Sequence, residues 1–172
     1  MRLAFAIPLL ALLACDSSPG GEVVSPPTLA VVDLQGVEAA LELEPGQGLL
    51  LNFWAIWCAP CVAELPELVE VGHEYEERGG RVIGVSYDLM VPGDDATSVQ
   101  PKIRDFLAGR GLDLDVLVYD ADDYEVINER FGLPGEIPVT LAIDASGEVV
   151  DRQHGKADAA RFEEMMRKAL GL

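Results

Sequence analysis

The sequence predicts one α/β domain in which a mixed central β-sheet is flanked by helices on both faces. Two mainly apolar runs, Gly48–Trp54 and Arg81–Asp88, are typical of buried central strands, and a helical pattern lies between them. Near the C-terminus, Ile137–Asp144 and Gly147–Gly155 form a strand pair around a short polar turn. Parallel crossovers followed by a terminal hairpin indicate a mixed sheet.

The other elements follow from residue spacing and from residues that end helices. Leu29–Leu43 holds two short apolar segments around Gln35-Gly36, which favours an N-terminal β-hairpin. Apolar residues recur at near-helical spacing over Ala59–Arg78, before two glycines that end the helix. The later elements, in chain order, are expected to be a loop (Leu89–Thr97), a helix (Val99–Arg110), a strand (Leu114–Asp120), a helix (Asp122–Gly132) and a helix (Ala157–Ala169).

Length and charge narrow the class of protein. The chain has 172 residues, room for one compact domain plus tails, and 49% of them are hydrophobic. The 30 acidic residues outnumber the 12 Lys and Arg residues and give a formal charge of −18. Binding to a nucleic acid backbone needs a surface rich in Lys and Arg, so the sequence predicts no nucleic acid partner.

The first residues have the pattern of an export signal. One basic residue, Arg2, precedes the apolar run Leu3–Leu13, which is too short to span a hydrocarbon core of about 30 Å as a helix. An ordinary secretory signal cleaved near Ala14 and an uncleaved anchor are both compatible with this pattern. However, "LLAC" (Leu12–Cys15) resembles the bacterial lipobox. This resemblance implies a signal peptide over residues 1–14 and a lipid on Cys15.

The segment after Cys15 predicts a tether. Asp16–Pro27 is rich in Ser, Gly and Pro and has no apolar period. Residues 15–27 are therefore expected to join a membrane anchor to a folded domain over residues 28–172. The domain would lie in an extracytoplasmic compartment, the periplasm, where disulfides persist.

Cys58 and Cys61 lie where a buried strand ends and a helix begins. Such a pair can be a structural disulfide, half of a zinc site or a redox centre. Unpaired N–H groups and a partial positive charge at a helix N-terminus stabilise a thiolate, the form that attacks disulfides. A bridge between residues three apart closes too short a loop to stabilise the fold much. The placement therefore favours redox chemistry.

Two motifs resemble the thioredoxin superfamily. Trp57–Cys61 is similar to its WCxPC centre, and Ile137–Thr140 is similar to its cis-proline loop. The pattern "LNFWxxWCxPCxxExP" (Leu51–Pro66), with the expected hairpin and a strand-helix insertion between Asp88 and Asp120, resembles the extracytoplasmic TlpA/ResA-type proteins. The resemblance implies a thioredoxin-like fold.

The resemblance also implies roles for the catalytic residues. Cys58 would be the exposed nucleophile and Cys61 the shielded resolving thiol. Asn52 stands where cytosolic thioredoxins carry a buried aspartate, and its amide cannot titrate. Glu64 matches a glutamate of the ResA-type proteins that would exchange a proton with Cys61. The alternative interpretation of Glu64 is an ordinary charge on the helix surface.

Four residues are expected to bind the substrate. A cis Ile137–Pro138 bond would turn the backbone of Ile137 toward a substrate strand beside Cys58. Pro60 would rigidify the first turn of the helix. Trp57 is expected at the edge of the site, together with Pro60, whereas Trp54 is expected in the core.

These observations predict a membrane-tethered thiol–disulfide oxidoreductase, a monomer without a cofactor or a bound metal, that reduces disulfides of exported proteins in cytochrome c maturation. A membrane electron donor is an implied partner, because an oxidising compartment would otherwise keep the pair bridged. Alternatives are an oxidising or isomerising enzyme of the same fold, a copper-binding metallochaperone lipoprotein, and a redox-inert binding module. Against copper binding, His73 and His154 are both expected to be solvated.

Overall fold

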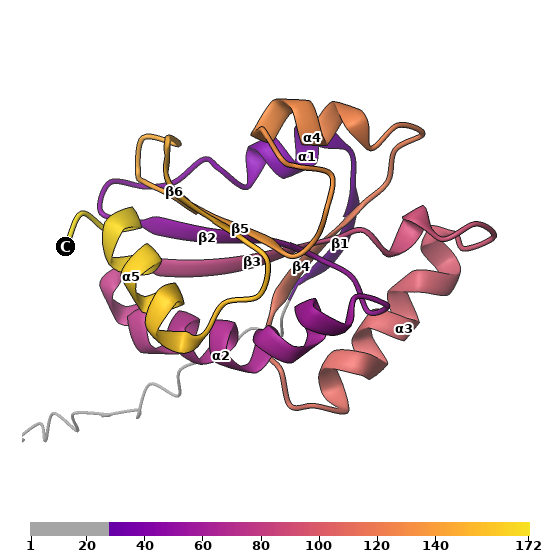
Figure 1. Ribbon diagram of the computed structural model, residues 1–172, viewed down its shortest axis with the longest axis horizontal. Helices are drawn as coiled ribbons and strands as arrows, with labels where there is room; N and C mark the ends of the chain where they lie inside the picture. Colours follow the sequence, from indigo (N-terminus) through magenta and orange to yellow (C-terminus); the bar gives the residue numbers. More distant parts are fainter. Residues whose placement is uncertain (1–27) are drawn as a thin grey trace, which may run out of the picture.

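The computed structural model describes residues 28–172 and has a single mixed sheet of six strands in the order β1-β4-β3-β2-β5-β6 (Figure 1). The strands are β1 (Leu29–Val32), β2 (Gly48–Trp54), β3 (Gly80–Ser86), β4 (Asp115–Tyr119), β5 (Val139–Ile143) and β6 (Val149–His154). The first four in this order run parallel, and β5 and β6 are antiparallel to their neighbours. The predicted mixed sheet is confirmed.

Helices cover both faces of the sheet, as predicted. They are α1 (Leu34–Ala39), α2 (Ala59–Tyr75), α3 (Ala96–Ala108), α4 (Glu125–Phe131) and α5 (Ala159–Ala169), with short 3₁₀ helices η1 (Glu76–Arg78) and η2 (Asp88–Met90). Figure 1 shows α2, α3 and α5 on one face and α1 and α4 on the other. The helix and strand expected between Asp88 and Asp120 are α3 and β4.

The predicted N-terminal β-hairpin is wrong. Only its first half is a strand, and β1 pairs in parallel with β4 rather than with a following strand. Asp33 ends β1 and begins α1, because its carboxylate accepts a hydrogen bond from the backbone N–H of Gly36 at 3.0 Å. Gly36 is needed for close packing rather than for a turn, since a Cβ atom there would lie 2.6 Å from Cβ of Val32.

Strand β2 is the centre of the sheet, and all seven of its residues are buried. It pairs with β3 along one edge and with β5 along the other, and helices pack on both of its faces. Phe53 packs against Phe131 of α4, while Trp54 on the opposite face packs against Phe106 of α3. This packing fixes the carboxyl end of β2, from which the chain leads directly to the cysteine pair.

Candidate active site

The cysteine pair lies at the N-terminus of α2, as predicted. Cys58 is the N-cap residue of the helix, and the backbone N–H of Cys61 points at Cys58 Sγ from 3.3 Å. Pro60 lies in the first turn, where its missing N–H leaves no intrahelical bond unmade. In the reduced protein this geometry would place a Cys58 thiolate against a backbone donor and the positive end of the helix dipole.

Cys58 and Cys61 form a disulfide, with Cα atoms 5.3 Å apart. The two sulfur-bearing residues differ in burial: Cys58 retains 6% of its surface exposed, and Cys61 retains none. An incoming disulfide can therefore reach the pair only from the side of Cys58.

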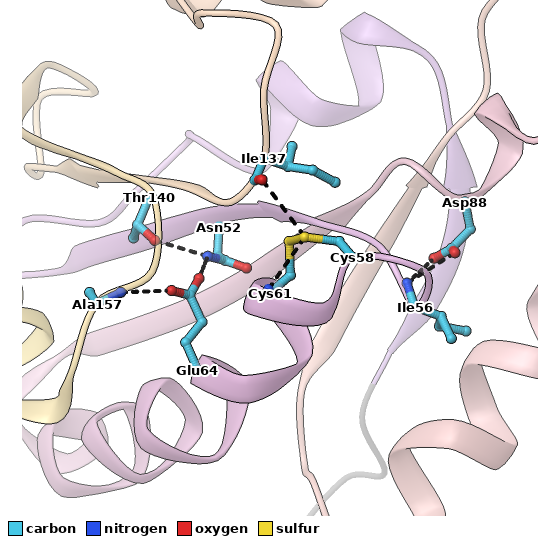
Figure 2. The surroundings of a disulfide bond; sticks show 9 residues. All are labelled: Asn52, Ile56, Cys58, Cys61, Glu64, Asp88, Ile137, Thr140 and Ala157. Carbon is cyan, nitrogen blue, oxygen red and sulfur yellow. Dashed lines mark hydrogen bonds between the residues drawn. A yellow bond between two sulfur atoms is a disulfide. The ribbon is translucent and has the colours of Figure 1, made fainter.

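The loop before β5 faces this exposed side. The Ile137–Pro138 peptide bond is cis, as predicted. The carbonyl oxygen of Ile137 lies 3.7 Å from Cys58 Sγ (Figure 2). Pro138 is buried, and its carbonyl accepts a hydrogen bond from the backbone N–H of Gly155. Ile137 is half-buried, and it is the Ile137 carbonyl that this loop places beside Cys58 Sγ.

The two tryptophans lie where the sequence predicted them. Trp54 is fully buried, whereas Trp57 is 52% exposed beside Cys58. Gly84, paired with Asn52 across β2 and β3, leaves room for the Trp54 indole: a Cβ atom there would lie 2.6 Å from Trp54 Nε1. Trp57 and Pro60 are both exposed and lie close to Cys58, the expected nucleophile, in the sequence.

Glu64 is fully buried rather than a charge on the helix surface. One carboxylate oxygen accepts a hydrogen bond from Asn52 Nδ2, and the other accepts one from the backbone N–H of Ala157, both at 2.9 Å. Asn52 Nδ2 also donates to the Thr140 hydroxyl at 2.9 Å. The polar groups of β2, α2, β5 and the chain before α5 therefore meet behind the cysteine pair (Figure 2).

A second buried carboxylate, Asp88, lies on the other side of the pair (Figure 2). Its two oxygens accept the backbone N–H of Ile56 at 3.0 and 3.2 Å, and one of them accepts the Ser86 hydroxyl at 2.7 Å. These bonds fix the loop that carries Trp57 and Cys58. Asp88 is not among the predicted site residues, and its only sequence signal is an acid at the end of the predicted buried strand Arg81–Asp88.

Burial raises the pKa of both carboxyl groups above their ordinary values. For Glu64, the hydrogen bonds from Ala157 and Asn52 and the charge of Lys156 act in the opposite direction and favour the anion. For Asp88, the opposing hydrogen bonds come from Ser86 and Ile56. The cysteine pair thus lies between two acids that hold protons more tightly than exposed ones do.

Other functional groups are limited within the described part of the chain. Residues 28–172 contain no group of three or more His, Cys, Asp or Glu side chains placed to hold a metal ion. None of the helices in this range has the length and apolar character needed to cross a bilayer. The predicted signal peptide over residues 1–14, the predicted lipidation of Cys15 and the predicted tether to residue 27 all lie outside the described residues.

A mixed sheet carrying a disulfide at the N-terminus of a helix, opposite a cis-proline loop, defines a thiol–disulfide oxidoreductase of the thioredoxin fold. Residues 25–152 match the model of the AhpC/TSA family, and the chain belongs to that family. It is 30% identical over 142 residues to the thiol-disulfide oxidoreductase ResA of Bacillus thuringiensis (strain Al Hakam), covering 83% of this chain and 75% of that protein.

Two further comparisons agree. The ResA protein of Geobacillus kaustophilus (strain HTA426) is 32% identical over 123 residues, covering 72% of this chain and 63% of the relative. Among solved structures, a thiol:disulfide interchange protein of the thioredoxin family from Chlorobium tepidum TLS aligns with a TM-score of 0.60 at 27% identity. That alignment covers 78% of this chain and 85% of the other. The Cys58–Cys61 pair is thus the redox-active pair of this chain.

Proposed function

We propose that the protein is a membrane-tethered reductant of disulfides in exported proteins, of the kind needed in cytochrome c maturation. The observation that carries the proposal is the unequal burial of the pair at the start of α2. Cys58 is the end that a substrate can reach, and Cys61 is enclosed. This asymmetry suits a nucleophile and a resolving thiol.

The proposed reaction moves two electrons from the reduced pair to the substrate. The Cys58 thiolate attacks one sulfur of a substrate disulfide, forming a mixed disulfide and releasing the first substrate thiolate. Cys61 then loses its proton to Glu64, and its sulfur attacks Cys58 Sγ. The Cys58–Cys61 disulfide forms, and the second substrate sulfur leaves as a thiolate that takes up a proton from solvent.

Two features support reduction as the direction. The residues between the cysteines, Ala59 and Pro60, supply no imidazole that would stabilise the Cys58 thiolate strongly. A buried Glu64 provides a proton acceptor for the resolving step. Re-reduction then requires an electron donor in the membrane, because the compartment itself is oxidising.

The surface around Cys58 suits an extended cysteine-containing segment. Such a segment would lie along the backbone at Ile137, where β-type pairing places its cysteine over Cys58, with Trp57 and Pro60 at the border. Apocytochrome c, which must present two free thiols to haem, is the proposed substrate type. An oxidised peptide with the C-x-x-C-H sequence tests this choice: it should be reduced faster than a scrambled peptide with the same disulfide.

The lipid anchor at Cys15 completes the proposal and places the domain in the periplasm, facing the membrane. Cys15→Ala in the full chain should move the protein from the membrane fraction to the soluble periplasmic fraction. Retention of this variant at the membrane would contradict anchoring through Cys15.

A trapping experiment tests the roles of the cysteines. Cys61→Ser should stall the reaction and accumulate mixed disulfides on Cys58, while the double variant Cys58→Ser/Cys61→Ser should trap nothing. The reduction potential, measured by equilibration with glutathione, tests the direction. A value near that of DsbA, about −120 mV, would make the protein an oxidant and contradict the proposal.

A further inference from the structure

Asn52 lies between Glu64 and the cysteine pair. Its nitrogen donates to Glu64 and to Thr140, while its Oδ1 atom is buried and has no hydrogen-bond partner among residues 28–172. In Figure 2 the nitrogen points toward Glu64 and the oxygen points toward the disulfide. A fully buried carbonyl oxygen without a donor is unfavourable, so its direction calls for an explanation.

The present orientation fits a charged Glu64. A carboxylate can only accept hydrogen bonds, so the Asn52 amide must turn its N–H groups toward it. The same orientation turns Oδ1 toward the sulfur atoms. In the disulfide, neither sulfur carries a hydrogen. After reduction, a protonated Cys61 gains an S–H group that can donate to Oδ1, which favours the thiol over the thiolate.

A protonated Glu64 requires the opposite orientation. One of its oxygens would still accept the N–H of Ala157, and the other would carry a hydrogen that needs an acceptor. A half-turn of the amide brings Oδ1 of Asn52 to this hydrogen. The Thr140 hydroxyl fits both orientations, because it can accept from the amide nitrogen or donate to the amide oxygen. The half-turn also aims Nδ2 at Cys61, where an N–H donor favours the thiolate.

We propose that the Asn52 carboxamide couples the protonation of Glu64 to that of Cys61 by turning over when one proton moves between them. One orientation matches Glu64 carboxylate with Cys61 thiol, and the other matches Glu64 carboxylic acid with Cys61 thiolate. No electron moves in this step, and Asn52 itself neither gains nor loses a proton. Asn52 is therefore a positioning residue, and its role rests on the proposed function of Glu64 and Cys61.

The other charged groups near Glu64 do not replace this coupling. Lys156, in the chain before α5, favours the Glu64 anion, and Glu67, one turn along α2, opposes it. Both act through their charge, and neither forms a hydrogen bond with Glu64. Within residues 28–172, Asn52 is the hydrogen-bond partner of Glu64 that also has a free group on the side of the cysteines.

The test is a double-mutant cycle on the reduced protein, with the Cys61 pKa read from the ¹³Cβ chemical shift of Cys61. Glu64→Gln imitates the protonated acid, because its amide nitrogen donates to a turned Asn52. It should lower the Cys61 pKa by about two units, a hundredfold change in acidity. In the background of Asn52→Leu, the same change should lower it by less than half as much. In the background of Asp88→Asn the full shift should remain.

Two results would overturn the inference, and they have different consequences. An equal shift with and without Asn52 would mean that Glu64 acts on Cys61 directly, and the proposed function would stand. No shift from Glu64→Gln in the wild-type background would also contradict the proposed role of Glu64.

A measurement without any substitution covers the case in which Asn52→Leu does not fold. The side-chain amide ¹⁵N and ¹H resonances of Asn52 in the reduced protein should titrate together with Cys61. Resonances that stay constant through that transition would overturn the proposal.

Discussion

The two buried carboxylates on either side of the cysteine pair have the same electrostatic character and different partners (Figure 2). Burial raises the pKa of both Glu64 and Asp88. Asp88 is bound by a backbone N–H and by the hydroxyl of Ser86, and these donors hold the loop before Cys58. Glu64 is bound by an amide whose oxygen is free on the side of the sulfur atoms.

This difference shows that the direction of a pKa shift does not by itself identify a group that takes part in the chemistry. An acid that only supports the structure and an acid that takes part in the chemistry can both be buried and have a raised pKa. What separates them is whether their partners have a second arrangement. The partners of Asp88 are part of the loop that it anchors, whereas the Asn52 amide can turn over. We therefore propose that Asp88 anchors the loop and that Glu64 exchanges the proton.

The largest expected effect is on the rate of disulfide reduction. Glu64→Gln should slow insulin reduction at pH 7 about a hundredfold, the lower end of what general acid–base catalysis contributes. The enclosed Cys61 then has no acceptor for its proton, even though the loss of the anion lowers its equilibrium pKa. Asp88→Asn keeps an oxygen for the N–H of Ile56 and should lose only a small part of the rate. Equal losses in the two variants would contradict the division of roles.

The next largest effect is on the free energy of unfolding and concerns the other buried carboxylate, Asp88. Asp88→Ala leaves the N–H of Ile56 and the hydroxyl of Ser86 without their acceptor. The free energy of unfolding should fall by about 2 kcal/mol, measured by urea denaturation of the oxidised protein. Glu70→Ala, at an exposed position of α2, is the control and should change little. An unchanged unfolding midpoint in Asp88→Ala would mean that water replaces these bonds.

The pH dependence of stability gives a third and smaller effect. A raised Glu64 pKa means that the folded protein holds this proton more tightly than the unfolded chain. Its stabilising contribution is complete below the unfolded pKa of about 4.3 and is lost as the pH rises through the folded pKa. Wild type should therefore lose stability relative to Glu64→Gln by up to about 1.4 kcal/mol per pH unit in that window. Urea unfolding at pH 4, 6 and 8 measures the difference.

Asp151 provides a control, because its contribution to stability should change with pH in the opposite direction. Arg161 and Lys168 bind its carboxylate and hold its pKa well below the ordinary value. Its stabilisation is present above the unfolded pKa of about 3.9 and is lost as the pH falls through the lower folded value. Asp151→Asn should therefore be most harmful at neutral pH. The interpretation of Glu64 would be wrong if the stability differences between wild type and the two variants, Glu64→Gln and Asp151→Asn, changed with pH in the same direction.

The position of the cysteine pair could be predicted from sequence because its signals are local. The apolar run of β2, the residues Trp57 to Cys61 and the helical spacing of α2 all lie within one short segment. The error at the N-terminus has the same origin. Gln35-Gly36 has the composition of a turn, but β1 pairs with β4, far along the chain, and Asp33 begins a helix instead.

The polar contacts around the pair could not be predicted in this way, because they join separate elements. Asn52 and Glu64 were both identified in the sequence, one as a residue that cannot titrate and the other as a proton acceptor. Their hydrogen bond depends on the way α2 lies on β2. The partnership of Asp88 with Ile56 depends on the register of β2 and β3, and that of Asn52 with Thr140 depends on the register of β2 and β5.

The smallest expected effect tests whether Thr140 belongs to the structural or the chemical side of this comparison. Thr140→Val keeps the shape of the side chain but removes the acceptor for one N–H of Asn52. The free energy of unfolding should fall by about 1 kcal/mol, and Thr140→Ser, which keeps the hydroxyl, should recover the hydrogen bond. Because Asn52 still donates to Glu64, insulin reduction by Thr140→Val should stay much closer to wild type than to Glu64→Gln. A rate as low as that of Glu64→Gln, with recovery in Thr140→Ser, would instead make the Thr140 hydroxyl part of the proton path between Cys61 and Glu64.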